Sequence, residues 1–176
     1  MSLVACPTNS KLLAIVGRSE VAVIVLPRKE WSALISGKIE CRTASVGPYY
    51  HGPRSSTIAS IKWHPLGNSG AALCILTEDA VLREYNINGD ASEPVNTLDF
   101  TQSTLARPSH ARPSRSSFAS HSKNTSVSRY SESAEDCEAV ALGFGSGVGD
   151  WGLLTGYCLM RDGALYAVCP YLPQDA

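Results

Sequence analysis

The most constraining feature of this chain is a short pattern that occurs twice, at residues 76–82 (LTEDAVL) and 159–165 (LMRDGAL). In each copy an apolar run leads into a charged pair that ends in Asp. A small residue and the beginning of a second, partly apolar run follow. Asp before a small residue favours a tight turn, because its carboxylate can bond to nearby backbone amides and because glycine adopts positive φ without a Cβ clash. The pattern therefore predicts two β-hairpins, with turns at residues 79–80 and 162–163.

The spacing of the two hairpins indicates a repeated β unit. Equivalent positions lie 83 residues apart, and 46 residues remain when the polar stretch 101–137 is left out. A period of about 40 to 45 residues with several short strands is typical of a β-propeller blade. An inner strand is expected at 58–63, before Pro65, and an outer strand at 95–100. Residues 58–100 are therefore predicted to form one four-stranded blade.

The rest of the chain is divided on the same pattern. The other predicted units are a first blade at 1–57, a Ser/Arg-rich insert at 101–138 and the start of a further blade at 139–176. Apolar runs at 12–16 and 21–26 predict a hairpin in the first blade. Residues 30–37 fit either a helical turn or a strand, so the conformation of 27–57 stays undecided. The predicted fold class is an all-β, WD40-like propeller.

Three segments resemble a known family. Residues 62–67 (KWHPLG) and 75–85 (ILTEDAVLREY) resemble the N-terminal propeller of the nucleoporin eighty-eight family. Residues 150–152 (DWG) and 157–173 (YCLMRDGALYAVCPYLP) are closer to the fungal form of that family, nucleoporin eighty-two. The resemblance implies a seven-bladed propeller followed by coiled coils.

The same resemblance implies a function. Members of the family lie on the cytoplasmic face of the nuclear pore complex, where they anchor other nucleoporins and the messenger-RNA export machinery, and they are not enzymes. The expected partners are therefore other nucleoporins of the export platform, with no small-molecule substrate, no cofactor and no catalytic or metal-binding residue. The alternative is a generic cytoplasmic WD40-type adaptor, in which the similarities around Trp63 and Trp151 arise from blade packing alone.

The length of the chain limits how much of a propeller it can form. Without the insert, 139 residues remain, enough for about three blades, whereas closed propellers have four to eight. The chain is expected to be the front part of a larger ring, from a truncated gene model or a fragment. Two blade faces would then be bare, and long apolar edges invite pairing with other chains.

Charge and hydropathy argue against nucleic-acid and membrane binding. A net charge of −1 with 18% charged residues provides no long-range field that would attract either partner. No apolar stretch approaches the 18 or more residues of a membrane-spanning helix. Direct contact with nucleic acid and membrane insertion are therefore not expected.

Cysteine and histidine spacing gives no sign of a metal site or a nucleophile. The six cysteines are Cys6, Cys41, Cys74, Cys137, Cys158 and Cys169, and they contain no C-x-x-C pair. They are interpreted as reduced thiols packed in strands, against the alternative of a cysteine nucleophile beside one of four histidines. The histidines are His51, His64, His110 and His121. His64 is expected to be a loop residue bonded to backbone.

Two further features have structural interpretations. Glycines at every second position of 143–149 fit neither phosphate-loop pattern and are interpreted as a connection between two strands of the later blade. Trp63 and Trp151 are both expected to be largely buried between strands.

The insert has its own composition. It is rich in serine and arginine, so we expect a disordered loop in which trypsin cuts first, at Arg115, Lys123 or Arg129. A plain linker is the leading interpretation. Phosphorylation, contact with RNA phosphates and ordering by a partner are the alternatives. The candidate phosphorylation sites, each with an arginine two residues upstream, are Ser109, Ser114 and Ser117.

Overall fold

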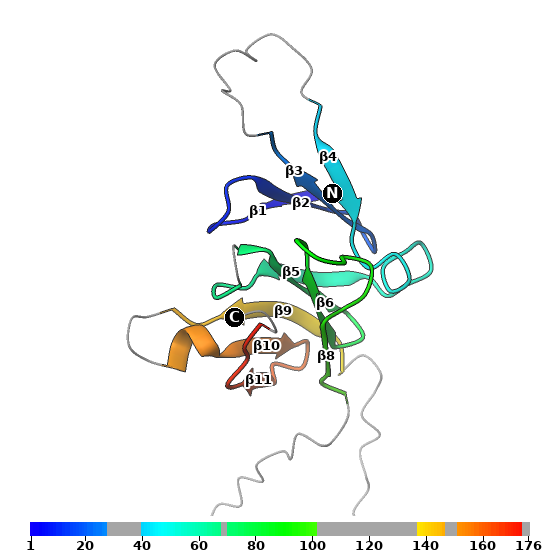
Figure 1. The fold of residues 1–176 in the computed structure, drawn as a ribbon. Coiled ribbons are helices and arrows are strands. Elements are labelled where there is room, and N and C mark those ends of the chain that lie inside the picture. The colour runs from blue at the N-terminus through cyan, green and yellow to red at the C-terminus, as the bar shows by residue number, and fades with distance from the viewer. Residues whose placement is uncertain (28–39, 68–69, 102–136, 147–150, 174–176) are drawn as a thin grey trace, which may run out of the picture.

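The computed structural model describes residues 1–27, 40–67, 70–101, 137–146 and 151–173. Its strands form three antiparallel sheets that are stacked one on another (Figure 1). The first sheet contains β1 (Ser2–Ala5), β2 (Leu12–Val16), β3 (Val21–Val25) and β4 (Arg42–Ser45), the second β5 (Ile58–Trp63), β6 (Ala72–Thr77), β7 (Val81–Asn86) and β8 (Asn96–Asp99), and the third β9 (Ala139–Phe144), β10 (Gly156–Met160) and β11 (Leu165–Val168). The all-β fold class is confirmed, and the number of blades in a complete ring remains a prediction.

Both predicted hairpins are present with the expected turns. β6 pairs with β7 and β10 with β11, each antiparallel to its neighbour in the chain. In the first turn the Ala80 amide donates to the Thr77 carbonyl, and in the second the Gly163 amide donates to the Met160 carbonyl. Ala80 and Gly163 both have positive φ, 60° and 86°. The two turns therefore require the same left-handed residue at equivalent positions.

The second sheet is buried on both sides because β6 contributes to two cores. Side chains alternate between the faces of a strand. Leu73 and Ile75 point into a first core cluster shared with the first sheet, and Cys74 and Leu76 point into a second core cluster shared with the third sheet. Every residue of β6 is buried. This arrangement explains why the strand reads as a continuous apolar run instead of an alternating one.

The outer faces of the stack are apolar. Leu3, Ile15 and Ala22 share the face of the first sheet that points away from the second sheet, as their cross-strand register shows. On the third sheet, Leu159 and Leu165 point outward and are exposed. These faces have the composition of surfaces that other blades would cover.

The expectation that both tryptophans are buried is right for Trp63 and wrong for Trp151. Trp63 is 5% exposed and ends β5, whereas Trp151 is 66% exposed. Trp151 begins the 3₁₀ turn η3 (Trp151–Leu154), which lies between β9 and β10 outside the sheet, and none of the described sheets covers it. The connection predicted at 143–149 also starts too early, since Gly143 and Phe144 belong to β9.

Two strands were not predicted from the sequence. β1 is a short strand that pairs with β2, and β4 lies in the segment whose conformation was undecided. Other expectations fall outside the described residues: those for 30–37, for 147–150 and for nearly all of the insert, with its serines, trypsin sites, His110 and His121. In the ranges that the structure describes, no helix is long and apolar enough to cross a membrane.

Candidate functional site

His64 joins the second and third sheets at the end of β5. Its ring is almost fully buried, its Nδ1 accepts a hydrogen bond from the Leu66 amide (3.1 Å), and its Nε2 lies 3.2 Å from the Tyr171 carbonyl oxygen. Because Nδ1 is an acceptor, a neutral ring carries its proton on Nε2. The Nε2–H group then donates a hydrogen bond to the Tyr171 carbonyl oxygen. Burial lowers the pKa of His64, and the bond to Tyr171 opposes that shift. The expectation of a loop histidine bonded to backbone is confirmed.

The Tyr171 side chain is a second polar group between the second and third sheets. The Tyr171 hydroxyl is 3.8 Å from the Cys74 sulfur and also interacts with the buried Glu84 carboxyl. Burial raises the pKa of the Cys74 thiol, and the nearby Glu84 raises it further. Burial likewise raises the pKa of Cys158 to about 11. Both cysteines are therefore protonated thiols at neutral pH, whereas a nucleophilic cysteine needs a lowered pKa.

All six cysteines are free thiols, and none forms a disulfide. Cys6, Cys74 and Cys158 are buried, Cys41 and Cys137 are half-buried, and Cys169 is exposed. The interpretation as small hydrophobic residues therefore fits the three buried cysteines, of which Cys74 and Cys158 lie in strands. Among the residues that the structure describes, no three His, Cys, Asp or Glu side chains come together as metal ligands do.

The loop after β4 carries another buried histidine, His51. Its Nε2 lies 3.0 Å from the Tyr85 hydroxyl, and the two rings meet edge to face. Burial, with a smaller effect from Arg83, lowers the pKa of His51 to about 4, so the ring is neutral. Gly47 begins this loop at φ 52°, and a Cβ there would collide with the Tyr85 hydroxyl. Sequence reasoning did not find this loop, although the glycine followed by proline, two tyrosines and histidine was visible.

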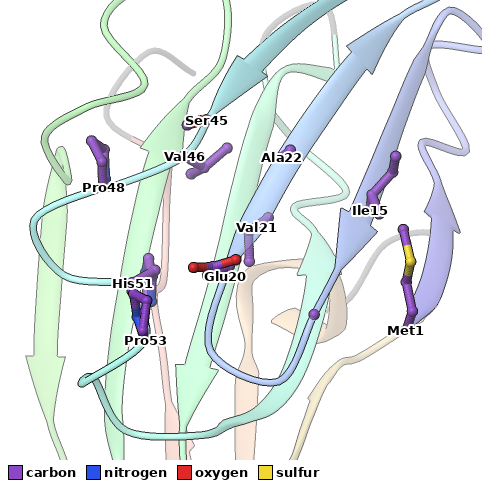
Figure 2. Close-up of a pocket in the computed structure, with 12 residues that line it drawn as sticks. Met1, Ile15, Glu20, Val21, Ala22, Ser45, Val46, Pro48, His51 and Pro53 are labelled. Atoms are coloured by element: carbon purple, nitrogen blue, oxygen red, sulfur yellow. The ribbon is translucent and has the colours of Figure 1, made fainter.

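The same loop borders a cavity of about 520 Å³ on the first sheet. Figure 2 shows that Glu20, before β3, and His51, from the loop, reach this cavity from different elements. Most of the wall is apolar, with Ile15, Val46 and Pro48 among its residues. An open apolar cavity with one carboxylate and a neutral histidine suits the binding of a side chain better than acid–base chemistry.

Comparison with known proteins identifies the family. A family model described as "Nucleoporin NUP82 beta-propeller" matches residues 1–175. The chain belongs to this family. The resemblance seen in the sequence is thereby confirmed.

Curated relatives come from fungi and a plant. The chain is 29% identical over 172 residues to nucleoporin NUP82 of Chaetomium thermophilum, 30% over 137 residues to nucleoporin nup82 of Schizosaccharomyces pombe, and 28% over 146 residues to nuclear pore complex protein NUP88 of Arabidopsis thaliana. The matches cover 94%, 77% and 81% of this chain. They cover only 19%, 14% and 15% of those proteins, so the chain spans a fifth of their length or less.

Solved structures give the same assignment. The fold matches a chain in the Chaetomium thermophilum heterotrimeric complex of Nup82 NTD, Nup159 TAIL and Nup145N APD, with a TM-score of 0.74 and 28% identity. That match covers 98% of this chain and 32% of the solved one. The yeast heterotrimeric Nup82–Nup159–Nup116 complex matches with a TM-score of 0.54 and 18% identity, which supports the fold alone.

Proposed function

We propose that this chain is the propeller portion of a docking component of the nuclear pore complex, located on its cytoplasmic face and supporting messenger-RNA export. The observation that carries the proposal is the family match over residues 1–175. The stacked sheets support it, because they offer rigid surfaces and edges for other proteins and their apolar outer faces require covering.

The proposed role is non-catalytic. His51 and His64 are neutral because their pKa values are lowered by burial, and the pKa of Cys74 is raised. Buried groups with these protonation states stabilise an interior and do not supply a general acid at neutral pH. The proposed partners are nucleoporins equivalent to those that accompany Nup82 in the solved complexes.

Localisation of the full-length protein tests the proposal. A tagged version is expected to mark the nuclear rim and to recover other nucleoporins on affinity purification, and its depletion is expected to retain polyadenylated RNA in the nucleus. A diffuse cytoplasmic signal without nucleoporin partners would instead favour the generic adaptor. Rim localisation without RNA retention would leave the pore assignment and refute the role in export.

A further inference from the structure

The loop between β7 and β8 contains the one Asn-Gly pair in the sequence, Asn88 and Gly89. Both residues are exposed. The loop belongs to the second sheet, which lies between the first and the third (Figure 1). Its exposure therefore does not come from an outer face of the stack that other blades would cover.

An asparagine followed by glycine can react with its own backbone. The backbone nitrogen of Gly89 can attack the side-chain carbonyl carbon of Asn88, because glycine has no Cβ to hinder the approach. The new C–N bond closes a succinimide ring, and the side-chain nitrogen of Asn88 leaves as ammonia with the Gly89 amide proton. Solvent water then opens the ring. Attack at one ring carbonyl gives aspartate, and attack at the other gives isoaspartate, in which the main chain runs through the former side chain.

The Asn88 side chain is free for this reaction. The Asn88 backbone amide donates to the Asn86 side-chain oxygen (3.0 Å), but the Asn88 carboxamide has no hydrogen-bond partner among the described residues. The other described asparagines are followed by residues that carry a Cβ, namely Ser10 after Asn9, Ile87 after Asn86 and Thr97 after Asn96. Asn88 is therefore the described asparagine that its following residue hinders least.

One backbone hydrogen bond restrains the attacking nitrogen. The Gly89 amide donates to the Asn86 carbonyl at 3.2 Å, the long end of the usual range, and this turn must open before Gly89 can attack. Breaking one exposed hydrogen bond lowers the reactive population by about tenfold at most. A restraint of this size slows the reaction but does not prevent it.

We propose that Asn88 is a site of spontaneous deamidation and that its conversion weakens the attachment of the loop that joins the first sheet to the second. The proposal concerns a covalent modification by solvent water and does not rest on the proposed docking function.

The contacts that follow Gly89 give the modification its structural effect. The Ala91 carbonyl accepts a hydrogen bond from the Gly47 amide (2.7 Å), and the Glu93 carboxylate accepts one from the Tyr50 hydroxyl (2.8 Å). These two bonds attach the loop after β4 to the second sheet. Isoaspartate adds a methylene to the main chain just before them, and either product adds a negative charge near the exposed Asp90.

Peptide mass spectrometry of the full-length protein, incubated at neutral pH over time, tests the modification. The tryptic peptide that begins at Glu84 contains Asn86, Asn88 and Asn96, so fragment spectra compare three asparagines in one molecule. Asn88 is expected to convert at least about tenfold faster than the other two, because only its neighbour lacks a Cβ. Labelling by an isoaspartate-specific methyltransferase identifies the product with the lengthened main chain.

Gly89→Ala is the matched variant. Gly89 has no positive φ, and the atoms nearest to an added Cβ lie at 3.6 to 3.9 Å, so alanine fits without a clash. Its conversion at Asn88 is expected to be about tenfold slower or less, whereas its thermal unfolding should equal that of the wild type. Equal conversion in the two proteins would overturn the proposed attack by the Gly89 nitrogen.

Two further results would contradict the proposal. If Asn88 converts in the urea-unfolded protein but stays intact in the folded one, the turn protects it and the site is not a modification site. In the converted fraction, the Gly47 amide is expected to exchange its hydrogen at least about tenfold faster than in the unmodified protein. Unchanged exchange at Gly47 would refute the weakened attachment of the loop.

Discussion

The indole Nε1 of Trp63 donates a hydrogen bond to the backbone carbonyl of Val4 (3.1 Å), which joins β5 to β1 across 59 residues of sequence. The Trp63 side chain thus packs in the first core cluster and also hydrogen-bonds the first sheet, so it links the first sheet to the second in two ways. Burial and hydrogen bonding act together here, because a buried indole N–H without an acceptor would be costly.

Replacing Trp63 with alanine is expected to lower the free energy of unfolding by about 3 to 5 kcal/mol, because it leaves a cavity and removes the hydrogen bond to the Val4 carbonyl. Trp151→Ala is the matched control, since Trp151 is exposed, and should change stability by less than about 0.5 kcal/mol. Urea unfolding followed by circular dichroism measures both. Similar losses in the two variants would contradict the packing described for Trp63.

Stability should depend on the protonation of His51. Its pKa is about 4 in the folded protein and about 6.5 when unfolded, so the unfolded state binds the proton more readily. Stability should therefore fall as the pH decreases below about 6.5, and His64, whose pKa is also lowered, acts in the same direction.

Thermal unfolding between pH 7.5 and 5 measures this effect above the range in which most carboxylates titrate. His51→Gln can keep a hydrogen bond to Tyr85 but cannot gain the proton, so its melting temperature should fall less over this interval. An identical pH dependence of the wild type and the variant would show that His51 does not determine it.

The turn after β10 should be sensitive to backbone conformation alone. Gly163 has φ 86° and open space where a Cβ would lie, whereas Gly143, in β9, has open space and no positive φ. Gly163→Ala is expected to lose about 1 to 2 kcal/mol, and Gly143→Ala to lose nothing or gain slightly. Urea unfolding of the pair separates strain from steric clash, and equal effects would argue against strain in the turn.

Alkylation should follow the burial of the cysteines. Iodoacetamide is expected to modify Cys169 first in the native protein, and Cys74 and Cys158 only after unfolding, because their raised pKa values and burial keep them as inaccessible thiols. Peptide mass spectrometry over time gives the order. Early modification of Cys74 would show that the second and third sheets separate readily.

The positions of Cys74 and Cys158 show how far the repeated pattern could be followed from the sequence. The two cysteines fall in equivalent strands but one residue apart in register, which was visible without a structure. Because side chains alternate, that offset puts Cys74 on one face of β6 and Cys158 on the opposite face of the equivalent strand β10. Both therefore point into the same second core cluster, which only the stacking of the sheets revealed.

The sequence by itself determined the strands and turns whose signals are local: the two hairpins, the apolar pair 12–16 and 21–26, the outer strand before Phe100, and the family. Tertiary structure decided what depends on distant neighbours. β1 is a strand because β2 offers it a partner, and Trp151 is exposed because its turn lies outside the sheets that the structure describes. His51 was found beside Tyr85 only because the loop folds back on the second sheet. Turn chemistry and side-chain alternation act over a few residues, whereas burial depends on which surfaces meet, and no short pattern encodes that.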